Sequence, residues 1–540
     1  MTGPGRRRAV ERRTASEANL VPELPAVRVG RGSVATAALL TEPDVDALLL
    51  PVAPSVEADD GVQPRAGTAD AAARYGIDLG ELAERLQVTG AAGDTHTVHL
   101  PRANGGSSAL PWASFPARIV LVGVGAETPQ DLRRAGAAIA RSTRGLRRVV
   151  TTVGADSGAV GARALVEGYL LGAYRHPSRA TGTPAPAPAQ DLVLLGRYVE
   201  AAVDAARVAA TATWVARVLT VTPSDTKSPA WLADRSVEMA LAAGLTAEVL
   251  GPEELAARGF GGLLAVGGGS ATGPRLVTVR YDPPAEQAKG GRTHPAPRHV
   301  VIVGKGITYD TGGLSIKPRE AMVAMKTDMA GAAVALATVL GAAAAGVRHR
   351  VTAVLPLAEN AVGASSYRPG DVLTVYGGTT VEIANTDAEG RIVLADALSH
   401  ADADLEPDIL VDVATLTGAA TLALGRGHAA LYSRDDRLAR SLEDAGADSG
   451  ELLWRMPLVR DYRTALDSDV ADIRHVATDP AAGAGSITAA LFLERFVGSR
   501  RWAHLDIAGP ARASSANHEI PEGATGFGAR LLLHWLTQLR

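Results

Sequence analysis

The sequence predicts an α/β protein with two domains. We expect a smaller N-terminal α/β domain and a larger C-terminal α/β domain whose mixed, largely parallel sheet is flanked by helices. The chain has 540 residues, and a single hydrophobic core rarely holds a chain of this length. Short Val/Ile/Leu runs alternate with helical patterns, which is typical of parallel sheets covered by helices. The Pro/Ala-rich stretch TGTPAPAPAQ (181–190) interrupts the alternation and favours extended conformers.

Residues 1–20 are expected to form a flexible basic arm, because they hold five arginines among small polar residues. A solvated tail is the simpler interpretation, and a contact with nucleic acid is the alternative. The arm lacks the apolar run of a signal peptide, so we expect a cytoplasmic protein. No window approaches about 20 apolar residues without charge, so no membrane span is expected.

The N-terminal α/β domain is expected over 21–196, ending in the Pro/Ala-rich loop. Its clearest elements are a strand at 117–125 (ARIVLVGVG), an amphipathic helix at 131–146 and a second strand that starts in 147–154. The alanine-rich segment 197–219 then predicts a long helix that connects the two domains.

The C-terminal domain is expected over 220–540. Strands are predicted at 299–306, 351–359 and 408–416, and helices at 330–346 and 393–402. In α/β domains, ligands bind beyond the carboxyl ends of the strands. The acidic motifs of this sequence fall at such positions, because each of them follows a Val/Ile/Leu run.

The composition excludes several kinds of chemistry. With no cysteine in the chain, disulfides, thiolate nucleophiles and Cys-ligated zinc are excluded, so any metal must be held by oxygen or nitrogen. The net charge of -4 provides no general attraction to nucleic acid or to an anionic membrane. H-E-x-x-H and G-x-S-x-G are absent, and AVGGGSATG (265–273) fits a tight turn between strands better than a phosphate loop.

Two acids and an arginine alternate in NTDAEGR (385–391). In an extended segment Asp387, Glu389 and Arg391 would point to the same side, so two carboxylates would share a small volume. Such a pair needs a positive partner, and a metal ion or a substrate cation would supply it. A polar turn that closes a strand is the alternative.

A second cluster lies in 301–333. It places Lys305 and Asp310 just past a strand, and Asp328 directly before a small-residue helix, which Asp328 could merely cap. A lysine at the end of a buried strand must reach water or be paired. Together with NTDAEGR, three aspartates, one glutamate and one lysine gather at one end of the predicted sheet. Carboxylates that bridge two divalent cations about 3.5–4 Å apart are typical of two-metal hydrolases.

GKGITYDTGGLSIKP, MKTDMAGAA and NTDAEGRIVLADAL, in this order and spacing, resemble the leucyl (cytosol) aminopeptidase family of dinuclear metallo-exopeptidases. The resemblance continues from about residue 210 to the end of the chain and is weaker in the N-terminal half. It implies an aminopeptidase that releases N-terminal residues from peptides by a two-metal-activated hydroxide. Leucine and similar apolar residues would be preferred.

The resemblance also implies a metal site. One ion would be bound by Lys305, Asp310, Asp328 and Glu389, and the other by Asp310, Asp387 and Glu389. Lys305 could be a ligand only as a neutral amine, with a pKa below its usual value of about 10.4. Two Mn²⁺ or Zn²⁺ ions per subunit are expected, while Mg²⁺ and Co²⁺ stay open.

Further positions match residues that are not ligands. Lys317, in a glycine-flanked loop, would stabilise the oxyanion, and Arg391 would hold a bicarbonate ion as general base. The remaining matches are to substrate-binding positions: Met325 in the pocket for the first side chain, and Thr415, Leu416 and Gly418 in a loop that binds the substrate backbone.

Relatives form homohexamers with active sites that face an interior cavity, so a homohexamer acting on peptides is expected, with no membrane partner. A DNA-binding regulator is a second hypothesis, since some relatives act as transcription or recombination factors and this chain has a basic arm. The net charge disfavours a nucleic-acid partner without excluding one. A dipeptide substrate such as cysteinylglycine also stays open, because it would use the same residues.

Overall fold

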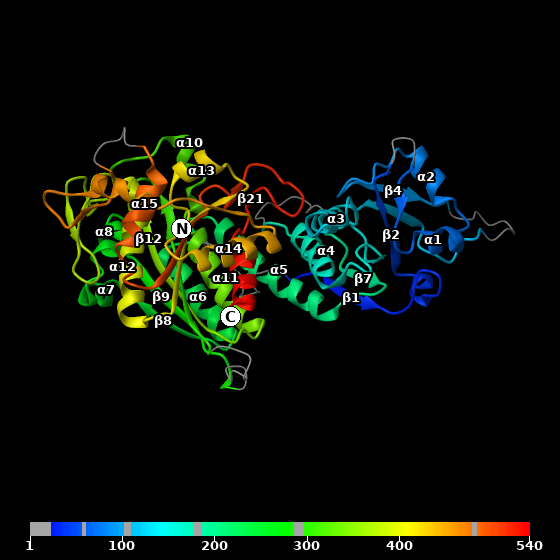
Figure 1. Ribbon diagram of the computed structural model, residues 1–540, viewed down its shortest axis with the longest axis horizontal. Coiled ribbons are helices and arrows are strands. Elements are labelled where there is room, and N and C mark those ends of the chain that lie inside the picture. Colours follow the sequence, from blue (N-terminus) through cyan, green and yellow to red (C-terminus); the bar gives the residue numbers. More distant parts are fainter. Residues whose placement is uncertain (1–22, 57–60, 102–109, 178–185, 286–295, 478–482) are drawn as a thin grey trace, which may run out of the picture.

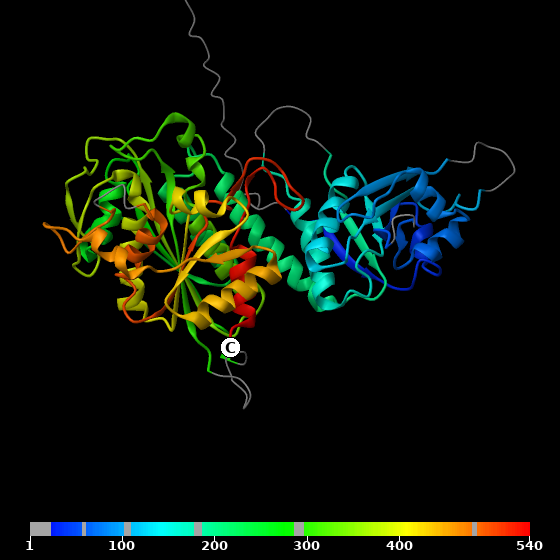
Figure 2. The same ribbon diagram turned by 45° about the horizontal axis from the view of Figure 1, so that its top comes forward.

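The computed structural model describes residues 23–56, 61–101, 110–177, 186–285, 296–477 and 483–540. These residues form two lobes joined by one long helix, α5 (Glu200–Val221) (Figures 1 and 2). This helix is the connector that was predicted at 197–219. The expected basic arm at 1–20 lies outside the described residues.

The smaller lobe is built on a seven-stranded sheet with the order β1-β7-β6-β2-β5-β4, in which β3 pairs with β2. Its strands are β1 (Ala26–Gly30), β2 (Val45–Ala53), β3 (Gln63–Pro64), β4 (Thr95–His99), β5 (Arg118–Gly123), β6 (Arg148–Thr151) and β7 (Asp191–Leu195). Its helices are α1 (Thr68–Tyr75), α2 (Leu79–Arg85), α3 (Pro129–Ser142) and α4 (Gly158–Gly172). The sheet is parallel except at β3 and β4, and β5, α3 and β6 confirm the predicted elements.

The larger lobe holds a nine-stranded sheet with the order β17-β16-β19-β15-β10-β12-β9-β8, in which β11 pairs with β12. Its strands are β8 (Thr246–Leu250), β9 (Arg275–Tyr281), β10 (His299–Gly304), β11 (Gly306–Asp310), β12 (Arg350–Asn360), β15 (Ile409–Ala414), β16 (Ala429–Ser433), β17 (Leu453–Arg455) and β19 (Arg501–Asp506). The central strands are parallel, whereas β8, β9 and β16 supply the antiparallel pairs. The predicted mixed, largely parallel sheet is confirmed.

Helices cover both faces of this sheet. The side chains of its strands alternate between the faces, and both faces are apolar. Val300 and Ile302 of β10 face one core, which α5, α6 (Pro229–Ala242), α11 (Ala330–Ala344), α14 (Asp436–Ser449) and α16 (Ala529–Gln538) complete. Val301 and Val303 face the other core, which α7 (Pro252–Arg258), α8 (Gly261–Gly267), α12 (Glu389–His400) and α15 (Gly485–Glu494) complete. Strands that are apolar on both sides are the reason why the Val/Ile/Leu runs are continuous.

The remaining elements are short. They include α10 (Arg319–Met322), α13 (Gly418–Leu424), the strands β13 (Val372–Thr374), β14 (Thr380–Glu382) and β18 (Ile473–Arg474) of a small sheet, and the pair β20 (Arg512–Ala513) and β21 (Gly523–Ala524). A turn between strands was predicted for the glycine-rich segment 265–273, and this prediction is wrong. The segment joins the end of helix α8 to strand β9, and its glycines let the backbone of 361–365 approach closely.

Among the described residues, one helical stretch, Met325–Ala344, is long and apolar enough by composition to span a membrane, but 83% of its apolar window is buried inside the protein. Most of this stretch is α11, which packs against β10, β12 and β15. Its apolar character therefore fits a core helix between the sheet and α5.

Candidate metal centre

The acidic motifs meet at the carboxyl end of the large sheet. Lys305 follows β10, Asp310 ends β11, and Asp310 lies opposite Asn360, the last residue of β12. Parallel strands end at the same edge, so residues far apart in the sequence are brought together there. Carboxylate oxygens of Asp310, Asp387 and Glu389 lie within 4.8 Å of one another.

This carboxylate group fits a divalent cation. Asp310 and Glu389 are buried, and Asp387 is partly buried. Burial, together with the negative charge of Glu389, raises the pKa of Asp310 to about 6. Buried carboxylates that repel each other in this way are stabilised by a bound cation, and oxygen donors suit hard or borderline divalent metals.

Lys305 lies inside this group. Its Nζ is 2.9 Å from Asp328 Oδ2 and 2.9 Å from Glu389 Oε1, and it donates a hydrogen bond to the Thr415 carbonyl at 3.0 Å. Burial alone would lower the pKa of Lys305, but the charges of the surrounding carboxylates, first of all Asp328, outweigh burial and raise it. As the sequence predicts, the lysine at the end of the buried strand is paired.

Lys317 approaches the same carboxylates from the loop after β11. Its Nζ is 2.8 Å from Asp310 Oδ2, and it also pairs with Asp387. Burial lowers the pKa of Lys317, while Asp310 and Glu389 raise it more strongly. The two lysines therefore contact different sides of the acidic group.

The segment 385–391 is not extended, so that prediction is wrong. Thr386–Ala388 form a 3-10 turn, because Asn385 Oδ1 accepts a hydrogen bond from the Asp387 N–H at 2.9 Å, and Glu389 begins α12 directly afterwards. The local hydrogen bond of an Asn side chain competes with strand pairing and favours a turn. Asp387 and Glu389 meet through this turn into a helix rather than by alternation along a strand.

Arg391 lies in the first turn of α12 and is buried. Its Nη1 donates to the His475 carbonyl at 2.7 Å, and its Nε has no hydrogen-bond partner among the described residues. Burial lowers the pKa of Arg391 to about 10, although the charge of Glu389 opposes this shift. Arg391 therefore remains a cation near neutral pH, and its Nε can donate a hydrogen bond to another group.

Asp328 is more than a helix cap. The residue that caps α11 is Met329, and its side chain makes no cap hydrogen bond. Asp328 instead pairs with Lys305 and accepts a hydrogen bond from Thr415 Oγ1 at 2.8 Å. Met325, at the start of the 3-10 turn Met325–Thr327, lies three residues before it.

The structure joins the loop 415–418 to a residue that the sequence reasoning missed. Asp506 is buried at the end of β19, and its carboxylate accepts hydrogen bonds from the Leu416 N–H at 3.1 Å and the Thr417 N–H at 3.0 Å. Thr417 Oγ1 also donates to it at 2.6 Å, and Gly418 then begins α13. The available signal was an acid directly after the apolar run in WAHLDIAGPA.

A second missed residue is Asn360. Its Nδ2 is 2.8 Å from Asp310 Oδ1 and 3.4 Å from Glu389 Oε2. It sits between two of the carboxylates, and the only sequence signal was a polar residue at the end of the apolar strand 351–359.

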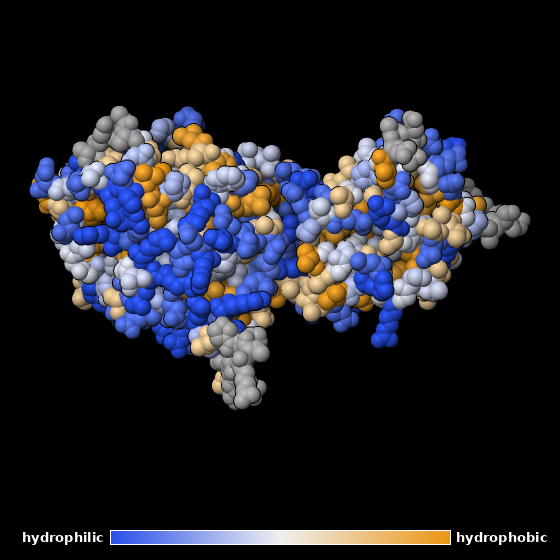
Figure 3. All heavy atoms as spheres, in the orientation of Figure 1, coloured by the Kyte–Doolittle hydropathy of each residue, from blue (hydrophilic) through white to orange (hydrophobic). Residues whose placement is uncertain are grey.

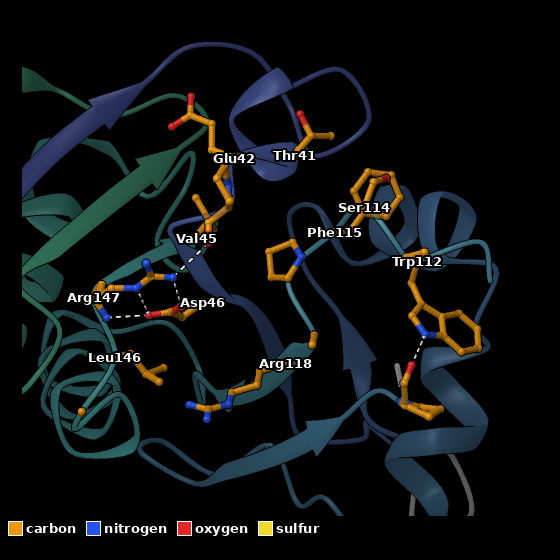
Figure 4. A pocket seen from close by; sticks show the side chains of 16 residues that line it. Thr41, Glu42, Val45, Asp46, Trp112, Ser114, Phe115, Arg118, Leu146 and Arg147 are labelled. Atoms are coloured by element: carbon orange, nitrogen blue, oxygen red, sulfur yellow. Dashed lines mark hydrogen bonds and ion pairs between the residues drawn. The ribbon is translucent and has the colours of Figure 1, made fainter. Parts of the chain in front are cut away.

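A cavity of about 800 Å³ lies in the smaller lobe (Figure 4). Arg147 and Asp46 form an ion pair at 2.8 Å on one side, and the Trp112 indole donates to the Pro101 carbonyl at 3.0 Å on the other. Arg118 projects between them (Figure 4). All its lining residues belong to the smaller lobe, so this cavity is separate from the carboxylate group.

Two family models match the chain. The model for the cytosol aminopeptidase family, catalytic domain, matches residues 214–533, and the model for the N-terminal domain of the same family matches residues 55–178. The probable cytosol aminopeptidase of Leifsonia xyli is 43% identical over 464 residues, which cover 83% of this chain and 88% of that protein. The probable cytosol aminopeptidase of Chlorobaculum tepidum is 39% identical over 447 residues, which cover 78% of this chain and 86% of that protein.

Solved structures agree with the family models. The bottromycin maturation enzyme BotP in complex with Mn is 35% identical, with a TM-score of 0.78 and coverage of 92% of this chain and 99% of that one. A mutant of tomato leucine aminopeptidase is 27% identical, with a TM-score of 0.79 and coverage of 96% of this chain and 97% of that one. The chain therefore belongs to the cytosol aminopeptidase family and is a metal-dependent aminopeptidase.

Proposed function

We propose that this protein is a two-metal leucyl-type aminopeptidase, which releases leucine and similar apolar residues from the N-termini of peptides. The observation that carries the proposal is the group of Asp310, Asp387 and Glu389, whose oxygens lie within 4.8 Å of one another next to Lys305. Carboxylates shared between two divalent cations about 3.5–4 Å apart are typical of two-metal hydrolases.

The proposed ligands divide into two sets that share Asp310 and Glu389. Lys305 and Asp328 complete the set for one ion, and Asp387 completes the set for the other. When bound, Mn²⁺ or Zn²⁺ ions would lower the pKa of water towards about 7 and polarise the scissile carbonyl. Lys305 must give up a proton to become a ligand, so metal uptake at this site is expected to release protons.

Two cations would act on the reacting groups without binding metal. Lys317 Nζ is proposed to donate to the oxyanion, and removing such a donor commonly costs about 10²–10³ in turnover. Arg391 is proposed to hold a bicarbonate ion as general base. Its buried Nε, which lacks a hydrogen-bond partner among the described residues, supports an anion there.

The substrate would lie against the loop that follows β15. Thr415, Leu416 and Gly418 are proposed to bind the peptide backbone, and Met325 to line the pocket for the first side chain. An apolar pocket discriminates by about 1–3 kcal/mol per methylene, so we expect a graded preference for leucine. A panel of N-terminal residues that includes cysteinylglycine would measure it.

We also infer that the protein forms a homohexamer, and that it lies in the cytosol, the compartment in the name of its relatives. Large apolar side chains are exposed at the end of the lobe with α10 and α13: Ile316 is 64%, Val323 73% and Leu422 91% exposed. Apolar atoms stand out among hydrophilic ones near α10 in the surface view (Figure 3). Contact with another copy would remove them from water.

Hydrolysis of leucine p-nitroanilide tests the proposed activity. The purified protein would be measured after chelation and again after adding Mn²⁺ or Zn²⁺, beside Asp387→Ala as the control. We expect the metal to restore activity to the wild type only, because the variant lacks a ligand of one ion. A folded, metal-loaded wild type that cleaves no N-terminal residue in the panel would refute the proposal.

A further inference from the structure

We infer that Asn360 is a positioning residue, which holds the carboxylates of Asp310 and Glu389 in the arrangement that metal binding needs. The inference rests on the proposed two-metal function and adds a residue that the proposed ligand sets do not contain. Asn360 is only 1% exposed at the end of β12, where β11 brings Asp310 directly opposite.

The chemistry of its neighbours fixes the orientation of the Asn360 amide. Nδ2 is 2.8 Å from Asp310 Oδ1, 3.0 Å from the Thr386 carbonyl and 3.4 Å from Glu389 Oε2. All three neighbours are acceptors, so the NH₂ group must face them. The opposite orientation would place the amide oxygen against two carboxylates.

This orientation costs stability. The other side of the amide, Asn360 Oδ1, is buried without a hydrogen-bond partner among the described residues. Leaving a buried polar atom unpaired destabilises the folded protein. An apolar side chain of similar size would avoid this cost but would lose the hydrogen bonds that Nδ2 donates to Asp310 and Thr386, so its two effects on stability oppose each other.

What the amide contributes is a fixed spacing between two ligands. Asp310 Oδ1 accepts from both Asn360 and the Gly312 N–H, at 2.8 and 2.9 Å, which sets the rotation of that carboxylate. Glu389 lies between Lys305 at Oε1 and Asn360 at Oε2. These are the two carboxylates that are proposed to contact both ions, so Asn360 aligns the shared pair.

Tyr367 offers a matched control. Its hydroxyl donates to the same Thr386 carbonyl at 3.0 Å, and it is buried like Asn360, at 6% exposure. No hydrogen bond joins it to the carboxylates in the described part of the chain. Tyr367→Phe therefore removes a buried hydrogen bond at the same carbonyl but leaves the alignment of Asp310 and Glu389 intact.

The experiment compares the full-length wild type with Asn360→Leu, Asn360→Ser and Tyr367→Phe. Calorimetric titration with Mn²⁺ gives the affinity, and thermal unfolding of the chelated proteins gives the stability without metal. Groups that orient metal ligands typically contribute about 10–100-fold in affinity, so we expect both Asn360 variants to bind Mn²⁺ that much more weakly. Thermal unfolding of the metal-free proteins shows which variants are folded, and Tyr367→Phe should keep the wild-type affinity.

Wild-type Mn²⁺ affinity in a folded Asn360 variant would overturn the inference. Asn360→Ser decides the matter if Asn360→Leu does not fold, since serine is small and polar. Equal losses of affinity in Tyr367→Phe and the Asn360 variants would also overturn it, because the effect would then be a general loosening of the centre. Failure of the proposed function looks different, since a metal-loaded wild type would then cleave no N-terminal residue, whatever affinity the Asn360 variants show.

Discussion

Gly390, the last residue but one of NTDAEGR, has no side chain, and the neighbouring Lys305 occupies the space where a Cβ would lie. A Cβ at this position would lie 2.5 Å from Lys305 Cε and 2.6 Å from its Nζ. In an exposed helix, alanine is more stable than glycine by about 0.8–1 kcal/mol. Here the close approach of Lys305 outweighs that preference, because the lysine is held by buried carboxylates.

We therefore expect Gly390→Ala to displace Lys305 from Glu389 and to weaken Mn²⁺ binding by about tenfold or more, as for other ligand-orienting contacts. Calorimetric titration would measure this. Gly80→Ala in α2 is the control, because the nearest atom to its Cβ, 3.3 Å away, belongs to the Asp78 side chain in the other lobe. Unchanged affinity in Gly390→Ala would contradict the predicted displacement.

His504 couples protonation to stability. Its Nδ1 is 2.5 Å from Asp412 Oδ1, and both side chains are fully buried. Burial lowers the pKa of His504, but the charge of Asp412 outweighs it and raises the pKa above the ordinary value of 6.5. The stability contributed by this pair is therefore complete below pH 6.5 and is lost as the pH rises through the raised pKa of the folded protein.

Unfolding by urea at several pH values tests this coupling in the wild type and in His504→Asn, which does not titrate. The wild-type advantage in the free energy of unfolding should shrink as the pH rises from 6 to 9, by about 1.4 kcal/mol for each unit by which folding raises the pKa. A difference that stays constant over this range would show that His504 does not change its protonation on folding.

At the level of elements, the loop after β15 depends on a neighbouring strand. Asp506 at the end of β19 receives two backbone N–H groups and one hydroxyl from Leu416 and Thr417. Thr415, at the other end of the loop, bonds to Asp328. The proposed substrate loop is thus tied both to the acidic group and to the next strand.

Asp506→Asn should loosen this loop, because an amide has one acceptor oxygen where the carboxylate has two. Hydrogen bonds to charged groups contribute about 1.5–3 kcal/mol, so we expect kcat/KM for leucine p-nitroanilide to fall at least about tenfold. Mn²⁺ affinity should change little, since Asp506 is not among the proposed ligands. Unaltered kinetics would mean that the loop holds its shape without Asp506.

Helix α12 shows how an element can differ from its local pattern. The helix predicted at 393–402 exists, but it begins at Glu389, four residues earlier. The alternating acids of NTDAEGR suggest a strand, yet Asn385 caps a turn instead. Side-chain capping is a contact of single atoms, and a period-two pattern cannot reveal it.

For the whole molecule, buried charges hold the two lobes together. Arg217 of α5 donates to the carbonyls of Leu171 at 3.0 Å and Thr525 at 2.7 Å, one in each lobe. Arg133 of α3 reaches across to the Asp448 carbonyl at 3.0 Å. Such buried donors need their partners, so the lobes are expected to move as one body.

The number of chains that assemble is a property of the whole molecule. If the proposed homohexamer forms, light scattering should give a mass six times that of the 55.5 kDa chain. Association would also remove Ile316, Val323 and Leu422 from water. A monomer at micromolar concentration would refute the homohexamer. It would leave the proposed activity intact, since all the proposed ligands come from one chain.

The sequence by itself determined the fold class and the kind of chemistry. Continuous apolar runs predict buried parallel strands, the long Ala-rich segment predicts α5, and the absence of cysteine restricts metal ligands to oxygen and nitrogen. Lys305 and Asp310 stand out because a charge at the end of a buried strand must be paired. These are properties of local composition and periodicity, which a chain displays before it folds.

Only the tertiary structure decided which atoms meet. Asn360 and Asp506 look like ordinary polar residues at strand ends, and their roles depend on the register of β11 against β12 and on the position of β19 beside β15. Gly390 looks like a helix-weakening residue until Lys305 is placed against it. Contacts between distant segments are set by packing, which one-dimensional patterns do not contain.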